Sequence, residues 1–227
     1  MLLDIRSVSK DYGIPGTGGY QQVLSNLSLT VDEGESIAIT GPSGSGKTTL
    51  LNLIGTLDKP GQGTILYKGN DITQLSGKEL NAFRNNEIGF IFQQHFLLPQ
   101  CTLIENVLLP TLPGRPGTAA TERAIKLIEK VGLKEHMHKK PRLLSGGECQ
   151  RTAVVRALIN NPGMLLADEP TGALDQVNAT ALYNLLSEIN REEKLTLIVV
   201  THSMELAAKM NRVYRLLNGK LELISPR

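Results

Sequence analysis

The chain has 227 residues, of which 41% are hydrophobic and 20% charged, and this composition excludes a disordered or fibrous protein. Its formal net charge of +2 creates no field for a polyanion, so we expect no nucleic-acid partner. The cysteines, Cys101 and Cys149, belong to no CxxC or Cys/His cluster, which favours free thiols in a reducing compartment. No secretory signal is expected, and no apolar run approaches the ~20 residues of a membrane span. We therefore expect any membrane role to act through a partner.

Residues 36–40 are predicted to form a short buried strand that leads into a glycine-rich loop. A helix is expected after the loop, because apolar residues recur at helical spacing: Leu50, Leu53, Ile54 and Leu57. Three later apolar runs, 88–92, 164–167 and 195–200, also predict strands, and the last is rich in β-branched residues.

Helical patterns alternate with these strands. One is expected over 121–131, where Ile125, Ile128 and Val131 share a face, and another follows from Leu182, Leu185, Leu186 and Ile189. Such alternation favours an α/β fold with a parallel sheet. Residues 94–159 contain no convincing strand, so we expect a helical lobe there, inserted between core segments 1–93 and 160–227 of one domain, 1–227.

A phosphate-binding loop is predicted between the first strand and its helix, where Gly41-Pro42-Ser43-Gly44-Ser45-Gly46-Lys47-Thr48 fits GxxxxGK[ST]. Glycines allow backbone N–H groups to curl around phosphate oxygens, and the helix start adds its positive dipole end. Lys47 would contact the β- and γ-phosphates, and the Thr48 hydroxyl would ligate Mg²⁺. The loop alone leaves a kinase, a GTPase and an ATPase as alternatives.

Polar side chains follow three predicted strands at the edge where open α/β sheets bind ligands. Strand 164–167 ends in Asp168, suited to hold Mg²⁺ through its water shell, and Glu169, suited to orient and activate the attacking water. A solvated acidic pair is the alternative. Gln93 and His202 occupy equivalent places, which favours γ-phosphate and metal sensing over purely structural roles.

The segment Leu144-Ser145-Gly146-Gly147-Glu148 precedes a helical stretch over 149–159. Ser145 and Glu148 fit a helix capping box, but the box does not explain two consecutive glycines, which weaken a helix start unless a ligand approaches the backbone. A helix start of this kind would bind phosphate.

With this segment the chain resembles the ATP-binding cassette (ABC) family across nearly its whole length. LSGGE is similar to the family signature, and the other motifs occur in the family's order: 41–48 resembles Walker A, Gln93 the Q-loop, 164–169 Walker B, Gly172-Ala173-Leu174-Asp175 the D-loop, and His202 the switch histidine. Cys149 and Gln150 stand where many relatives have two glutamines, and Gly172 replaces a common serine. Neither departure removes a catalytic group.

The resemblance implies a RecA-like P-loop NTPase core with a mainly parallel sheet, an N-terminal antiparallel β portion and an inserted helical subdomain. It implies ATP and Mg²⁺ as cofactors, with Lys47, Gln93, Glu169 and His202 catalytic and Thr48, Gln93 and Asp168 at the metal. ATP-binding residues would be Tyr12, Gly41, Pro42, Ser43, Gly44, Ser45, Gly46, Lys47, Thr48, Thr49, Ser145, Gly147 and Asp175.

Two copies are expected to face head to tail, with Ser145 and Gly147 of one closing on the nucleotide of the other. Tyr12 resembles the aromatic residue that stacks on adenine, and Tyr20 is its rival because a glycine-rich segment lies between them.

Residues 89–99 and 102–107 are similar to the lipoprotein-releasing and macrolide-export branch, which includes a cell-division ATPase. This implies a separate transmembrane permease subunit and a peripheral place on the cytoplasmic face of the inner membrane. Phe96, Leu97 and Leu98 would then form an apolar surface for the partner, or else fill the lobe's own core. The alternative within this branch is the ATPase of a cell-division or signalling complex that transmits mechanical work. A soluble repair or translation ATPase and a small-molecule kinase are the other interpretations. A repair ATPase would carry a long coiled coil, which this sequence lacks, and a translation ATPase would carry two cassettes, whereas this chain has one. A kinase would leave LSGGE and His202 unexplained.

Overall fold

The structure, a computed structural model, describes residues 1–14, 16–114 and 117–226 and contains two sheets. The larger sheet has the strand order β10-β9-β3-β8-β7-β6, in which all neighbours are parallel except β10 and β9. Its strands are β3 (Ser36–Thr40), β6 (Ile88–Ile91), β7 (Met164–Asp168), β8 (Thr196–Val200), β9 (Arg212–Leu217) and β10 (Lys220–Pro226). The expected mainly parallel sheet is confirmed.

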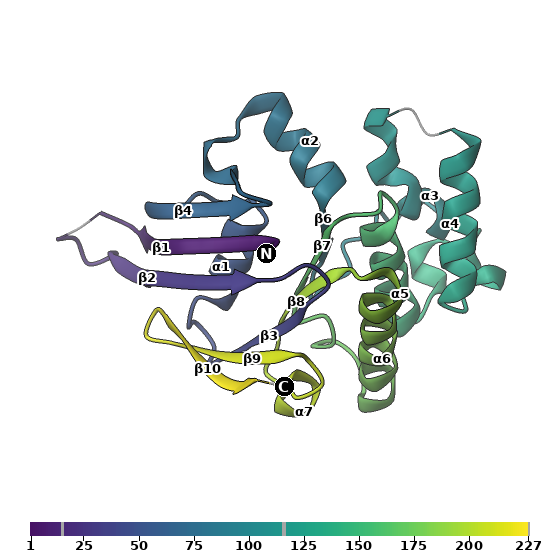
Figure 1. The fold of residues 1–227 in the computed structure, drawn as a ribbon. Helices are drawn as coiled ribbons and strands as arrows, with labels where there is room; N and C mark the ends of the chain where they lie inside the picture. The colour runs from purple at the N-terminus through teal and green to yellow at the C-terminus, as the bar shows by residue number, and fades with distance from the viewer. Residues whose placement is uncertain (15, 115–116, 227) are drawn as a thin grey trace.

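The smaller sheet is antiparallel, in the order β2-β1-β4-β5, and lies on one side of the larger one (Figure 1). Its strands are β1 (Leu3–Tyr12), β2 (Gln21–Val31), β4 (Gln62–Tyr67) and β5 (Asn70–Asp71). Helix α1 (Lys47–Ile54) is buried between the two sheets, because its leucines pack against apolar residues of both. The start of α1 is thereby held at the edge where the phosphate loop lies.

Side chains of the larger sheet alternate strictly between two cores. Ile37 and Ile39 of β3 face the core that contains α1, whereas Ala38 faces the opposite core. Strand β8 repeats the pattern, with Ile198 toward α1 and Leu197 away from it. A strand buried on both faces reads as a continuous apolar run, which is why these strands were recognisable in the sequence.

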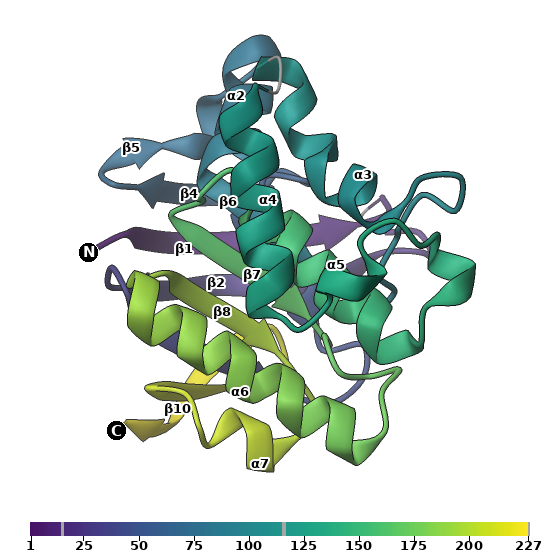
Figure 2. The ribbon, with the colours of Figure 1, turned by 90° about the vertical axis from the view of Figure 1, so that its right-hand side faces the viewer.

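The face away from α1 is covered by helices α5 (Gly146–Leu158) and α6 (Gln176–Glu193), with α4 (Thr118–Lys130) outside them (Figure 2). The described part of residues 94–159 contains no strand, as expected. The remaining helices are η1 (Ile72–Gln74), α2 (Gly77–Glu87), α3 (Leu103–Leu108), η2 (Leu109–Gly114), η3 (Lys134–His136), η4 (Pro141–Leu143) and α7 (Met204–Ala207).

One expectation about α1 is wrong. Leu57 was expected to continue its apolar face, but the helix ends at Ile54 and the Leu57 side chain is 46% exposed. The backbone leaves the helical conformation at Thr56, whose φ is 58°, so Leu57 no longer follows the helical period.

Candidate active site

The phosphate loop connects β3 to α1 and depends on glycine at two positions. Gly41 has a φ of 150°, and a Cβ there would collide with the carbonyl oxygen of Leu216. Gly46, the residue that caps α1, has a φ of 98°, and its Cβ would lie 2.7 Å from Cγ1 of Val23. Since L-residues rarely adopt these conformations, the loop shape requires the glycines of the motif.

Lys47 and Ser45 present polar groups inside this loop. The Lys47 side chain is buried, and its Nζ donates to the carbonyl oxygens of Gly41 at 3.0 Å and Pro42 at 2.9 Å. Ser45 Oγ is buried without a hydrogen-bond partner among the described residues. An ammonium group, an orphan hydroxyl and the start of a helix together make a site for an anion of phosphate type.

Asp168, at the end of β7, carries an unsatisfied buried oxygen. Its Oδ1 has no hydrogen-bond partner in the described structure. Burial raises the pKa of the Asp168 carboxyl, and the Thr48 hydroxyl and the Lys47 ammonium oppose that rise. The described residues contain no cluster of three or more His, Cys, Asp or Glu side chains that could hold a metal ion by itself. This fits Mg²⁺, which keeps several waters and binds through one or two protein oxygens plus substrate phosphates.

We expect Asp168→Asn to stabilise the nucleotide-free protein at neutral pH. A carboxyl whose pKa rises on folding binds its proton more tightly in the folded chain, so stability falls as the pH rises from the unfolded-state pKa through the folded-state one. At pH 7.5 the variant should melt about 2 °C or more above the original chain, and the difference should vanish near pH 4. Thermal unfolding at both pH values measures this.

Asp175→Asn is the matched control, because the backbone N–H of Asn178 lowers the pKa of that exposed carboxyl. It should give no gain at pH 7.5. A melting temperature of the Asp168 variant equal to or below that of the original chain would contradict the expected cost of ionising Asp168.

Glu169 follows Asp168 in an unusual backbone conformation, with a φ of 46°. The conformation is held by its own N–H, which donates to Val200 O at 3.0 Å, and by the N–H of Gly172, which donates to Glu169 O at 2.9 Å. Such strain persists only where the surroundings enforce it, and it is common at functional sites.

His202 holds the Glu169 carboxylate from the end of β8. The backbone N–H of His202 donates to Oε2 at 3.2 Å, and its Nε2 lies 3.0 Å from Oε1. Burial raises the pKa of Glu169, and His202 opposes the rise. A carboxylate with a raised pKa is a stronger base than a free one, which suits proton abstraction from water.

Gln93, just beyond β6, completes the set of strand ends. Its amide lies against the D-loop, where a Cβ on Gly172 would be 2.7 Å from Gln93 Nε2. A glycine at 172, in place of the family's common serine, therefore leaves room for this amide. The convergence of the strand ends on one cleft is as expected from the sequence.

The cleft has a volume of about 440 Å³. Its lining residues are Tyr12, Gln21, Val23, Ser43, Gly44, Gly46, Lys47, Thr48, Thr49, Gln93, Asp168, Glu169 and His202. Tyr12 is therefore in the cleft, and Tyr20, its rival, does not line it within the described structure. Sequence reasoning missed Gln21 and Val23, because they reach the cleft only through the pairing of β2 with β1, in which Tyr12 lies opposite Gln21.

Ser145, Gly147 and Asp175 lie outside this cleft. Ser145 caps α5 through a capping box in which Glu148 Oε2 accepts from Ser145 N at 2.7 Å. The capping role expected for Ser145 and Glu148 is therefore confirmed. Asp175 caps α6 with its side-chain carboxylate, which accepts from Asn178 N at 2.8 Å. These residues contribute nothing to the cleft of their own chain.

Comparison with known proteins decides the family. A family model described as ABC transporter matches residues 24–172. This chain belongs to the ABC transporter family. Its cofactors are therefore ATP and Mg²⁺, and the chain is an ATPase.

Several relatives of this ABC ATPase share almost its whole length. It is 46% identical over 221 residues to the lipoprotein-releasing system ATP-binding protein LolD 1 of Rhodopirellula baltica, covering 97% of this chain and 96% of that protein. It is 46% identical over 226 residues to LolD of Shewanella oneidensis, with coverages of 98% and 96%. The ATP-binding cassette MJ0796, in a dimeric post-hydrolysis state bound to ADP and Pi, matches with a TM-score of 0.90 and 37% identity, covering 100% of this chain and 99% of that one. Within the described residues, no helix is both long and apolar enough to span a membrane.

Proposed function

We propose that this ABC ATPase is the nucleotide-binding subunit of a complex of the lipoprotein-releasing type, in which two copies close on ATP and drive a separate transmembrane subunit. The proposal depends above all on the 46% identity to LolD proteins over nearly the full length of both chains. A dimeric cassette as a structural neighbour supports the two-copy arrangement. The complex would place this chain on the cytoplasmic face of the cell membrane.

In this proposal the polar residues of the cleft bind the phosphates and the metal ion and activate the attacking water. Lys47 binds the β- and γ-phosphates, and Thr48, Asp168 and Gln93 hold Mg²⁺, which when bound neutralises charge that develops on the phosphates. Glu169 orients the attacking water and accepts its proton, and its raised pKa supports that task. His202, 3.0 Å from Glu169, keeps that carboxylate in place and senses the γ-phosphate.

The second copy supplies the missing wall of the site. Ser145 and Gly147 stand at the start of α5, a helix end suited to a phosphate group, yet neither lines the cleft of its own chain. The position of Ser145 and Gly147 outside their own cleft supports a head-to-tail dimer, in which they and Asp175 contact the nucleotide held by the partner. Loss of the γ-phosphate after hydrolysis would remove these contacts and reopen the dimer.

Residues 94–159 would act as a helical subdomain that couples the nucleotide to the membrane partner, with 1–93 and 160–227 as the core. The signature helix α5 is tied to the segment around Gln93 by Gln150 Nε2, which donates to Phe92 O at 2.9 Å. Arg156 on the same helix donates to the carbonyl oxygens of His95 and Phe96, both at 2.7 Å. A displacement of α5 on dimer closure would therefore move the segment that carries Gln93.

The surface proposed for the membrane partner lies beside this segment. Phe96 is 59% exposed and Leu98 38% exposed, whereas Leu97 is only 7% exposed and belongs to the core. The sequence left open which of the three side chains is core and which is surface, and the structure divides them. Phe96 also borders a hollow of about 380 Å³ between α2 and α5, which suits a short amphipathic helix of the partner.

We expect Phe96→Asp to abolish co-purification with the membrane partner, because a charge is costly to bury in a protein interface. The ATPase rate of the isolated chain should stay within about twofold of the original rate, because the substitution leaves the cleft intact. The measurement is a pull-down of the tagged chain from detergent-solubilised membranes of its own cell, with mass spectrometry of the bound proteins.

Leu223→Asp provides the control, because Leu223 is 50% exposed on β10, away from this surface. It should retain the partner. Recovery of ribosomes alone by the unaltered chain, or of the same membrane protein by the Phe96 variant, would contradict the proposal.

A further inference from the structure

Tyr12 reaches the nucleotide cleft from the last residue of β1, where it pairs with Gln21 of β2. The register between β1 and β2 shifts between Val8 and Lys10 and again between Lys10 and Asp11. The glycine-rich connection to β2 begins directly after Tyr12. Backbone pairing places the residue but leaves its side-chain rotamer open, so contacts of the side chain itself must set the angle of the ring, which is 43% exposed.

A carboxylate from a different part of the chain binds the Tyr12 hydroxyl. Tyr12 donates from its phenol oxygen to Asp58 Oδ2 at 2.8 Å. Asp58 lies beyond α1, and its backbone N–H donates to Asn52 O in that helix at 3.3 Å. The contact joins β1 to the end of α1, the helix that starts with Lys47.

Asp58 is itself fixed by two donors to its other oxygen. Lys10 Nζ and the backbone N–H of Lys59 both donate to Asp58 Oδ1 at 2.7 Å. Lys10 Nζ also donates to Lys59 O at 2.8 Å, and its side chain is only 14% exposed. Burial by itself raises the pKa of Asp58, but the hydrogen bonds from Lys10 and Tyr12 outweigh it and lower the pKa. The carboxylate is thus ionised and oriented at neutral pH.

Lys10 also contacts the ring of Tyr12. Its Nζ lies 5.0 Å from the centre of the Tyr12 ring, in cation–π geometry. Tyr12 lines the cleft, and Lys10 does not. Lys10 therefore packs on the Tyr12 ring from outside the cleft, while Tyr12 itself is part of the cleft wall.

We propose that Asp58, fixed by Lys10, is a positioning residue for nucleotide binding that holds the Tyr12 ring at the angle at which the adenine base stacks. The inference rests on the proposed adenine contact of Tyr12. Residues Lys10, Asp58 and Tyr12 are called the tyrosine clamp below. Base stacking on an aromatic side chain stabilises a bound nucleotide, so a misplaced ring has a measurable effect on affinity.

The test compares ADP with inorganic tripolyphosphate, both with Mg²⁺, by titration calorimetry on the full chain. Asp58→Ala should weaken ADP binding about threefold to tenfold and leave tripolyphosphate binding within about twofold, because only ADP carries a base. Tyr12→Phe, which removes the hydroxyl alone, should weaken ADP binding to a similar extent. In the Tyr12→Phe chain, Asp58→Ala should then have no further effect, since the two residues act as one unit.

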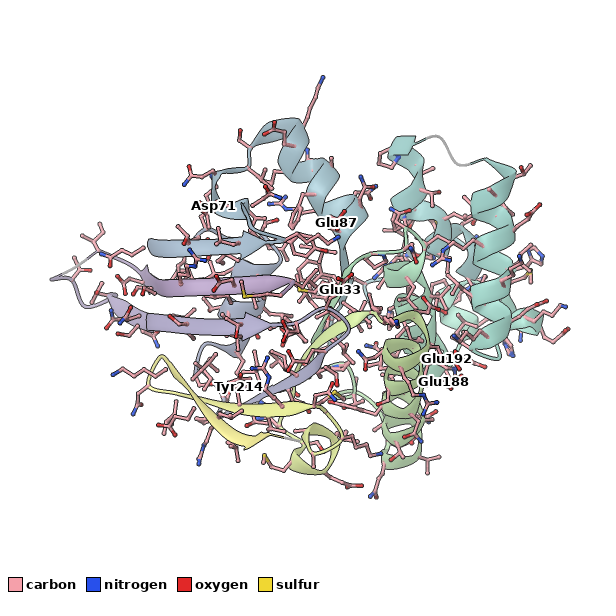
Figure 3. The ribbon with its side chains drawn as sticks, in the orientation of Figure 1. Glu33, Asp71, Glu87, Glu188, Glu192 and Tyr214 are labelled. Carbon is pink, nitrogen blue, oxygen red and sulfur yellow. The ribbon has the colours of Figure 1, made fainter. Side chains whose placement is uncertain are left out.

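The chain carries a matched control arrangement at the other end of β1. There Tyr67 donates to Glu87 Oε2 at 2.8 Å, and Lys68 Nζ lies 3.2 Å from the same oxygen and 5.2 Å from the centre of the Tyr67 ring. Glu87, at the end of α2, is labelled in Figure 3 and is not a lining residue of the nucleotide cleft. Glu87→Ala should bind both ligands as the original chain does.

Equal weakening of ADP and tripolyphosphate by Asp58→Ala would overturn the clamp, because it would indicate a general disturbance of α1. Normal ADP binding by Tyr12→Phe would overturn it as well, and this variant carries the test if Asp58→Ala does not fold. If Tyr12→Ala weakens ADP binding but Asp58→Ala does not, the adenine contact stands and the clamp fails. If Tyr12→Ala leaves ADP binding unchanged, both fail.

Discussion

Glu169→Gln is expected to lower the rate of ATP hydrolysis by about 10²–10⁴-fold while ATP still binds, because glutamine keeps the size of the side chain but cannot accept the proton of the attacking water. The phosphate loop and the Asp168 carboxylate are unchanged, so the γ-phosphate contacts should persist. The dimer that forms on ATP should then remain closed. Size-exclusion chromatography with light scattering, in the presence of ATP and Mg²⁺, measures the mass of the trapped species.

The same variant with ADP should remain a monomer, because the γ-phosphate is absent. Glu188→Gln is a suitable second control, because Glu188 is an exposed carboxylate on α6 (Figure 3). This variant should hydrolyse ATP at the original rate. A Glu169 variant that stays monomeric at saturating ATP would contradict the proposed two-copy mechanism. One that hydrolyses ATP normally would contradict the role of Glu169 as base.

Two inactive variants, Lys47→Ala and Ser145→Arg, are expected to restore activity to each other when mixed. Lys47 serves the cleft of its own chain, while Ser145 should serve the cleft of the partner. Each variant alone would have no complete site, and the mixed dimer would have one. If half of the dimers are mixed and one of their two sites is intact, about a quarter of the original rate should return. Phosphate release at several mixing ratios measures it.

Arginine at position 145 is tolerable because Ser145 is exposed, although loss of the helix cap costs about 1 kcal/mol. Thr102→Arg is the matched control, since Thr102 caps α3 through the same kind of capping box but is not part of the signature. Thr102→Arg by itself should hydrolyse ATP at the original rate, whereas Ser145→Arg by itself should be inactive, which separates a role of position 145 in the site from the cost of losing a helix cap. Absence of any restoration would show that Ser145 and Lys47 do not serve one shared site.

The sequence was most informative where local chemistry determines local structure. The phosphate loop could be recognised because its backbone requires glycine at Gly41 and Gly46, and the motif ends in Lys47 and Thr48, the first residues of the helix that follows. Strands β3, β6, β7 and β8 could be recognised because they are buried in the larger sheet and read as continuous apolar runs. Polar residues placed directly after such strands must meet at one edge of a parallel sheet, and this places Asp168, Glu169, Gln93 and His202 together.

Other features depend on contacts between distant residues. Leu57 was assigned to α1 because its spacing fits a helix, but a positive φ at Thr56 ends the period. Phe96 and Leu97 are adjacent apolar residues with opposite exposures, and only the packing of the helical segment separates them.

The tertiary structure also decided which tyrosine lines the cleft. Tyr12 and Tyr20 flank the same glycine-rich segment, and local sequence does not distinguish them. The choice follows from the hydrogen bond between Tyr12 and Asp58, which lie 46 positions apart and meet only through the packing of β1 against the end of α1. The sequence by itself therefore determined the family resemblance, the phosphate loop and the polar residues that meet at its edge of the sheet, because those depend on backbone conformation and strand ends. Which tyrosine lines the cleft, and which of Phe96 and Leu97 is exposed, were decided by long-range packing, which no local pattern records.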